Sequence, residues 1–179
     1  MTDSEILQLY RSGERDKAFR GLVSSYKERL YWHIRRMVLD HDDTDDCLQN
    51  TFVKVWQSLE RFRGDSQLYT WLYRIATNES LTFLARQQTR GGNIDLAAAG
   101  RLSTDPWFDG DQLQLSLHKA IAKLPPKQKA VFNLRYFEEM PYEKIAQVLE
   151  TSEGALKASY HHAYEKVKAW VKEEMVVKY

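Results

Sequence analysis

Aromatic and arginine side chains alternate between residues 52 and 83 of this 179-residue chain. Seven aromatic residues fall in this span, and three arginines lie among them: Arg61, Arg63 and Arg74. Aromatic faces stack on unpaired bases, and cationic side chains neutralise phosphates, so this mixture is typical of single-stranded nucleic-acid binding. Aromatic residues also build hydrophobic cores, and we expect that role for Phe52, Trp56 and at least half of the others.

A second candidate surface lies near the C-terminus. A short predicted helix over 142–149 is followed by a polar turn at 150–154, and apolar residues then recur at helical spacing: Leu156, Tyr160, Ala163, Val167 and Trp170. This is the pattern of a helix-turn-helix, whose second helix enters the major groove with its N-terminal residues. Lys157, His161 and His162 lie off the apolar stripe near the start of that helix. The alternative is an ordinary helical hairpin with a solvated face.

Metal and catalytic sites are not indicated. Residues 40–46 hold five aspartates, but the run lacks the glycine and glutamate of a calcium loop, and we expect it to cap a helix beginning near Asp43. Adjacent histidines such as His161 and His162 point about 100° apart on a helix and do not readily share an ion. Phosphate-loop, nucleophile-elbow and zinc-protease motifs are absent from the sequence. We predict no enzymatic activity, no metal and no cofactor.

The elements that must position these side chains are all predicted to be helices. Apolar residues recur with helical period, and no run alternates long enough to indicate a strand. The first 105 residues contain no proline, whereas Gly13 and Gly64 mark breaks. Predicted helices cover about 3–11, 15–38, 43–61, 67–89, 113–124, 128–137 and 142–149, and a last one runs from a cap at Thr151 or Ser152 to about residue 177.

Residues 91–112 are predicted to be a linker. They contain four glycines, a proline and four aspartates against one arginine, without a sustained apolar period. A long segment of this kind is unusual inside one compact domain. We therefore predict an all-α protein of two small helical domains, 1–90 and 113–179, joined by an acidic flexible linker. In that linker we expect the Trp107-Phe108 pair to anchor the loop.

Composition narrows the class of protein further. The net charge is only +1, so neither half carries enough basic residues for tight duplex binding alone. No apolar run approaches the length of a membrane span, the N-terminus is unlike a signal peptide, and one cysteine, Cys47, excludes an internal disulfide. We predict a cytoplasmic protein without direct membrane insertion, with Cys47 in the core.

The sequence resembles the extracytoplasmic-function sigma factors of the sigma-70 family. The strings DDCLQNTFVKVW at 45–56, FRGDS at 62–66 and TWLYRIATN at 70–78 resemble sigma region two. The segment from LP at 124–125 to YF at 136–137, with PYEKIA at 141–146 and SEGALK at 152–157, resembles region four. The two regions occur in the family's order, across the predicted linker.

The resemblance implies a protein that binds core RNA polymerase, through its beta-prime and beta subunits, and directs it to promoter DNA, held inactive by an anti-sigma factor. The residues that match polymerase-docking positions are Asp46, Gln49 and Asn50. Those that match minus-ten readers are Arg61, Phe62, Arg63, Gly64, Asp65, Ser66, Trp71, Arg74 and Asn78. Those on the minus-thirty-five reading helix are Lys157, Ala158, Ser159, His161 and His162.

Two other interpretations stay open at this point. One is a stand-alone helix-turn-helix regulator with an N-terminal sensor or dimerisation domain, which would bind duplex DNA without polymerase. The other is an adaptor, or a protein sequestered by an anti-sigma factor, that binds no DNA.

Overall fold

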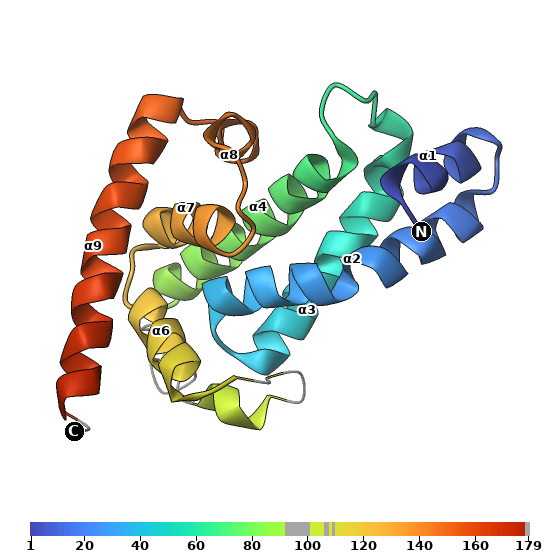
Figure 1. Cartoon of the computed structure of the whole chain (residues 1–179). Coiled ribbons are helices and arrows are strands. Elements are labelled where there is room, and N and C mark those ends of the chain that lie inside the picture. The colour runs from blue at the N-terminus through green and yellow to red at the C-terminus, as the bar shows by residue number, and fades with distance from the viewer. Residues whose placement is uncertain (92–100, 106–107, 109, 178–179) are drawn as a thin grey trace.

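The computed structural model describes residues 1–91, 101–105, 108 and 110–177, and every regular element within them is a helix (Figure 1). This confirms the predicted all-α fold. The first half contains α1 (Asp3–Arg11), α2 (Arg15–Val38), α3 (His41–Ser58), the short 3₁₀ helix η1 (Leu59–Arg61) and α4 (Leu68–Thr89). After the 3₁₀ turn η2 (Arg101–Thr104), the second half contains α6 (Gln112–Ala122), α7 (Pro126–Tyr136), α8 (Tyr142–Leu149) and α9 (Glu153–Val177).

Local sequence explains where several helices begin. The aspartate run starts α3, because the Asp40 carboxylate accepts a hydrogen bond from the Asp43 N–H at 3.2 Å. The helix begins at His41, two residues before its predicted start. The Ala155 N–H donates to Ser152 Oγ at 3.3 Å at the start of α9, which confirms one of the two predicted caps. Gly64 takes a left-handed φ of +81° in the turn between η1 and α4.

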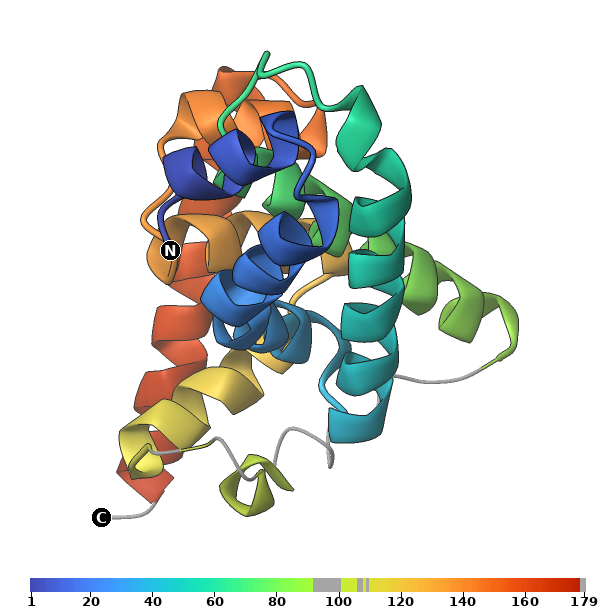
Figure 2. The ribbon, with the colours of Figure 1, turned by 90° about the vertical axis from the view of Figure 1, so that its right-hand side faces the viewer.

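The core of the first half lies between α2, α3 and α4, with α1 packed on α2 (Figure 2). Leu22, Leu30 and Ile34 of α2 are fully buried there, as is Leu72 of α4. Cys47 of α3 is also buried, as predicted, and burial raises the pKa of its thiol to about 12.

The second half packs directly against the first. Helix α7 contacts α2 and α4, and α8 contacts α4. Figure 1 shows α7 lying between α9 and the first-half helices. The largest apolar cluster is continuous across this seam, because it contains Leu72 of α4 together with Ile145 and Val148 of α8. The division into two domains stays a prediction, but in this arrangement the two halves share a core.

Part of the predicted linker is docked on the first half. Leu102 in η2 is buried, and the buried Asp105 carboxylate lies 3.1 Å from the Arg35 Nε and accepts a hydrogen bond from the Tyr31 hydroxyl. Residues 101–105 therefore differ from the structureless linker that we predicted, because Asp105 finds a buried cation. Phe108 lies 6.4 Å from the ring of His118, edge to face. Residues 92–100, 106–107 and 109 lie outside the described chain, and with them the predicted anchor Trp107.

Candidate nucleic-acid interface

The three predicted polymerase-docking residues share an exposed face of α3. Asp46, Gln49 and Asn50 are exposed, at the i, i+3 and i+4 positions that a helix brings together. Cys47 and Leu48, which lie between Asp46 and Gln49 in the sequence, are buried and pack in the core. The face is free to meet another protein, whereas the docking role itself stays a prediction.

The predicted minus-ten loop is held by an aromatic pair. The rings of Phe62 and Trp71 lie 5.1 Å apart at 47°, and both side chains are half-buried. Between them the chain turns at Gly64, while Arg61, Arg63, Gly64 and Asp65 are exposed and Ser66 is half-buried. The aromatic pair thus joins the loop to the first turn of α4 and leaves its charged side chains in solvent.

The remaining predicted minus-ten residues line one face of α4. Trp71, Arg74 and Asn78 follow i, i+3, i+7 spacing, and Arg74 and Asn78 are exposed. Arg74 does not stand alone, because its guanidinium is paired with the carboxylate of Glu150 at the end of α8. The neighbouring Glu79 is paired with Lys54 of α3, which links these two helices.

The helix-turn-helix forms as predicted from α8 and α9. Leu156 and Ala163 are buried, whereas Lys157, Ala158, His161 and His162 are exposed and Ser159 is half-buried. The Lys157 ammonium lies 5.8 Å from the ring centroid of Tyr142 in α8, and the rings of His161 and His162 lie 5.8 Å apart. The first two turns of α9 therefore present a set of polar and small side chains suited to the major groove.

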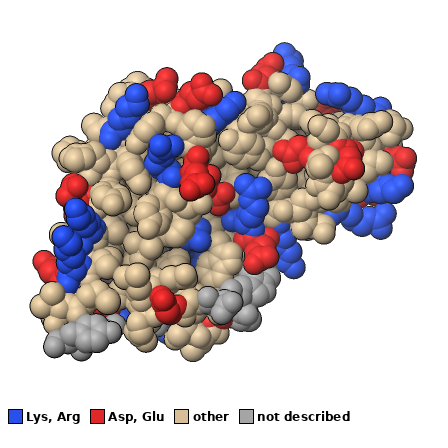
Figure 3. All heavy atoms as spheres, in the orientation of Figure 1, with Lys and Arg blue, Asp and Glu red and all other residues tan. Residues whose placement is uncertain are grey.

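Charges of both signs are interspersed over the face drawn in Figure 3, without a continuous basic surface. This agrees with the net charge of +1. Among the described residues, none of the helices combines the length and apolar character needed to cross a bilayer.

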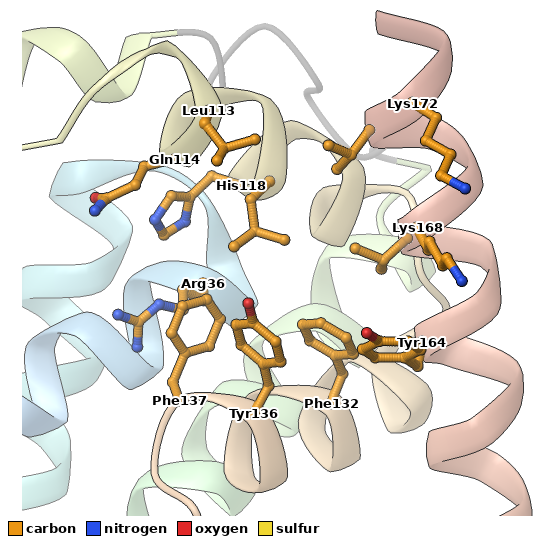
Figure 4. A pocket seen from close by; sticks show the side chains of 13 residues that line it. Arg36, Leu113, Gln114, His118, Phe132, Tyr136, Phe137, Tyr164, Lys168 and Lys172 are labelled. Carbon is orange, nitrogen blue, oxygen red and sulfur yellow. The ribbon is translucent and has the colours of Figure 1, made fainter. Parts of the chain in front are cut away.

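A cleft between α6, α7 and α9 escaped sequence analysis. It holds about 570 Å³, and the rings of Phe132, Tyr136 and Phe137 point into it from α7 and the residue after it (Figure 4). Arg36 of α2 lines one end, and Lys168 and Lys172 of α9 line the opposite wall. The helical spacing of these aromatic residues indicates a helix face that packs against other helices. Which part of that face the other helices leave exposed can be seen only in the structure.

Three titratable groups lie at the seam, where Lys129 is buried and His118 and Arg36 are half-buried. The His118 ring stacks on Phe137 at 6.0 Å, and the Arg36 guanidinium lies 3.8 Å from the same ring. Burial lowers the pKa of His118 to about 3, with Arg36 and Arg35 adding to it, and burial lowers that of Arg36 to about 10. The Lys129 ammonium of α7 donates to the Met37 carbonyl at 3.2 Å, and burial lowers its pKa to about 8. Lysines are mostly exposed, so no sequence signal marked this one.

The chain matches family models for both halves. Residues 22–90 match sigma-70 region 2, and residues 114–167 match sigma-70 region 4. The first match contains α3, α4 and the loop between them; the second contains the helix-turn-helix.

Curated relatives match over nearly the whole chain. The ECF RNA polymerase sigma-E factor of Haemophilus influenzae is 30% identical, over 93% of this chain and 94% of that protein. The RNA polymerase sigma-H factor of Pseudomonas aeruginosa is 29% identical, over 92% of this chain and 91% of that protein.

Two solved structures share the fold. One is the sigma factor RpoE in complex with the anti-sigma factor NepR from Bartonella quintana, with a TM-score of 0.69 and 20% identity over 87% of this chain and 98% of that one. The other is CnrH in complex with the cytosolic domain of CnrY, with a TM-score of 0.66 and 26% identity over 88% of this chain and 90% of that one.

Proposed function

Because the chain belongs to the extracytoplasmic-function sigma factors of the sigma-70 family, we propose that it binds core RNA polymerase and directs it to a specific set of promoters. The observation that carries this proposal is the presence, on one molecule, of an exposed α3 face and of a recognition helix in the family's order. The first supplies a protein contact, and the second supplies a DNA contact.

The two proposed DNA-contacting surfaces are suited to different forms of DNA, one to a duplex and the other to a single strand. The rigid N-terminal part of α9 fits the major groove of the minus-thirty-five duplex, where base edges differ for every base pair. The 61–66 loop and the Trp71, Arg74 and Asn78 face of α4 fit unpaired bases and phosphates of the minus-ten strand. Because this chain has a net charge of only +1, polymerase supplies most of the affinity for DNA, and this chain supplies the choice of promoter.

An anti-sigma factor is the second protein partner that we propose. The solved relatives RpoE and CnrH were each captured in complex with another protein, which in the first case is named as an anti-sigma factor. In this chain the cleft between α6, α7 and α9 is the surface we assign to it. Its aromatic floor and the cations Arg36, Lys168 and Lys172 fit an amphipathic helix with acidic residues.

The proposal places the chain with polymerase in the cytoplasm and assigns it no reaction and no cofactor of its own. Its experimental test is a mobility-shift assay on promoter fragments, with core polymerase, the purified chain, or both. We expect a specific shifted complex only when both are present. Specific duplex binding by the chain alone would favour a stand-alone regulator, and failure to bind core polymerase would contradict the proposal.

A further inference from the structure

Arg15, the first residue of α2, makes contacts that its place in that helix does not explain. A positive charge at the N-terminus of a helix opposes the helix dipole, and the preceding Glu14 makes no capping hydrogen bond with its side chain. The Arg15 guanidinium instead reaches the C-terminal end of α3. Because α3 has no basic residue in its own last turn, Arg15 supplies a cation where the dipole of that helix favours one.

The Arg15 guanidinium contacts three groups around the end of α3. Its Nη2 donates to the Trp56 carbonyl at 2.6 Å, and its Nη1 donates to the Glu60 carboxylate of η1 at 2.7 Å. Its Cζ lies 4.1 Å from the centroid of the Trp56 ring, and the ring of Phe19 packs edge-on against the same tryptophan at 5.1 Å. The planar, two-pronged guanidinium thus fixes the direction in which η1 leaves α3.

This direction determines where the 61–66 loop begins. The Phe62 N–H, which follows η1, donates to the Leu59 carbonyl at 3.2 Å, and the Phe62 ring packs against Trp71 of α4. The tip of the loop is exposed and turns at Gly64. The orientation of η1 therefore sets where Phe62 meets Trp71, and with it where the exposed tip lies relative to α4.

The Arg15 contacts fix geometry more than they stabilise the fold. The Glu60 side chain is 65% exposed, so solvent screens the ion pair. The Arg15 Nε is buried and has no hydrogen-bond partner among the described residues, which is unfavourable. A side chain that adds little stability but holds one direction of the chain is suited to a positioning role.

We propose that Arg15 is a positioning residue for minus-ten recognition, which holds η1 and the 61–66 loop at the angle at which the loop receives an unpaired base. The inference rests on the proposed function, because it takes this loop as a minus-ten reader. Arg15 acts through Trp56 and Glu60 and does not itself contact DNA. Lysine cannot replace it, because an ammonium lacks the planar pair of donors that reaches both acceptors.

Nuclear magnetic resonance of the full free chain tests the positioning without polymerase or DNA. Arg15→Ala should shift the amide signals of residues 59–66 and speed hydrogen exchange of the Phe62 N–H about tenfold, as expected when a hydrogen bond to a charged group is lost. The signals of the docking residues Asp46 and Gln49 should not move. Arg15→Lys, which keeps the charge, should cause the same shifts.

The matched control is Lys17→Ala, which removes an exposed cation of the same helix turn, paired with Glu14. It should leave the signals of residues 59–66 unchanged. Melting temperatures of all three variants confirm that each one is folded.

Holoenzyme reconstituted with the same variants tests the consequence for DNA. The probe is a single-stranded oligonucleotide with the minus-ten bases of a promoter that the parent holoenzyme opens, and each base is varied in turn. Arg15→Ala and Arg15→Lys should lower the preference for the best base about five- to tenfold, equivalent to about one stacked base. Affinity for core polymerase and base preference at the minus-thirty-five element should stay at the parent values.

Three results would overturn the inference. The first is a set of loop amide signals that is the same in the parent and in both Arg15 variants. The second is full rescue of base preference by Arg15→Lys. The third is an equal loss of affinity for every base with a smaller salt slope, which would mark Arg15 as a direct phosphate contact. A chain whose loop shifts as expected but that binds no core polymerase would contradict the proposed function and leave the positioning of the loop standing.

Discussion

The two candidate DNA-contacting surfaces are built in opposite ways. The minus-ten surface combines a loop, held by the Phe62–Trp71 pair, with a helix face on which Arg74 is engaged by Glu150. The minus-thirty-five surface is the N-terminal part of a single helix, α9, on which Lys157 and His161 are exposed. A loop can mould around a flipped base, whereas a rigid helix reads a regular groove. Of the two surfaces, only the first therefore depends on how the two halves are arranged.

The largest effect is expected at α3, because both DNA surfaces act only when the chain is bound to core polymerase. Asp46→Arg combined with Gln49→Ala should weaken core binding by about 2–5 kcal/mol, the loss typical when one partner of a charge pair that is buried and hydrogen-bonded in the complex is removed. A pull-down titration with core polymerase measures it.

The matched control for this variant is Asp16→Arg with Gln8→Ala, which makes the same changes at exposed positions of α2 and α1. Exposed substitutions of this kind change the free energy of unfolding by only about 0.5 kcal/mol or less. Equal core affinity for both double variants, with equal melting temperatures, would remove α3 from the docking assignment.

Trp71→Ala should weaken binding of the minus-ten strand and leave binding of the minus-thirty-five duplex unchanged. Loss of a stacking ring costs about 1–3 kcal/mol per base, and Phe62 also loses its partner. Permanganate footprints of the holoenzyme should show less promoter opening, and Asn78→Ala should act in the same direction. Tyr164→Ala, an exposed aromatic on α9, is the control. Footprints that match the parent would mean that the strand lies elsewhere.

Two histidines, His33 buried in the first half and His118 half-buried at the seam, make the stability of the fold depend on pH. Burial lowers the pKa of both His33, in the first-half core, and His118, at the seam, to about 3, against about 6.5 when unfolded. Because the unfolded chain binds more protons below pH 6.5, stability should be constant above that value and fall as the pH drops toward 3. The slope approaches about 1.4 kcal/mol per pH unit for His33, and less for the partly exposed His118.

Urea unfolding between pH 7.5 and 5 measures these contributions. His33→Gln should flatten the pH dependence in any arrangement of the halves, since its ring lies between α2 and Thr77 of α4. His118→Gln should flatten it only if the seam is closed. A parent and a His118→Gln variant with the same slope would contradict the closed arrangement.

The smallest effects belong to the recognition helix. Lys157→Ala should weaken minus-thirty-five binding by about 1 kcal/mol or less across sequences and reduce the salt slope by about 0.9, as expected for one lost phosphate contact. His161→Ala and His162→Ala should instead change the base preference in a library of minus-thirty-five variants bound by holoenzyme. Flat profiles for both, in folded protein, would remove His161 and His162 from the base-reading surface.

The sequence predicted the helices and exposed faces well because those signals are local. Apolar spacing placed Leu156 and Ala163 inward and His161 outward, the aspartate run marked the start of α3 to within two residues, and Ser152 is one of the two caps predicted for α9. The contacts that it missed join distant residues. Arg74 and Glu150 lie 76 positions apart, and no periodicity links such partners.

Buried polar groups were missed for a second reason. Lys129 has the residue type of a surface position, and only the packing of α7 on α2 brings its ammonium to the Met37 carbonyl. Asp105 belongs to a segment whose composition predicts a linker, yet it is buried against Arg35. In both cases a charged side chain is buried because it contacts a partner that is distant in the sequence, so the usual exposure of such residues to solvent does not hold.

Run-off sequencing of transcripts made by reconstituted holoenzyme determines whether this chain acts as a sigma factor. Core polymerase with this chain should initiate at a defined set of genomic sites that share minus-ten and minus-thirty-five elements. The Asp46→Arg, Gln49→Ala variant should lose these transcripts, and core polymerase alone should not make them. Transcripts that are identical with and without the chain, at concentrations where it is folded, would contradict its assignment as a sigma factor.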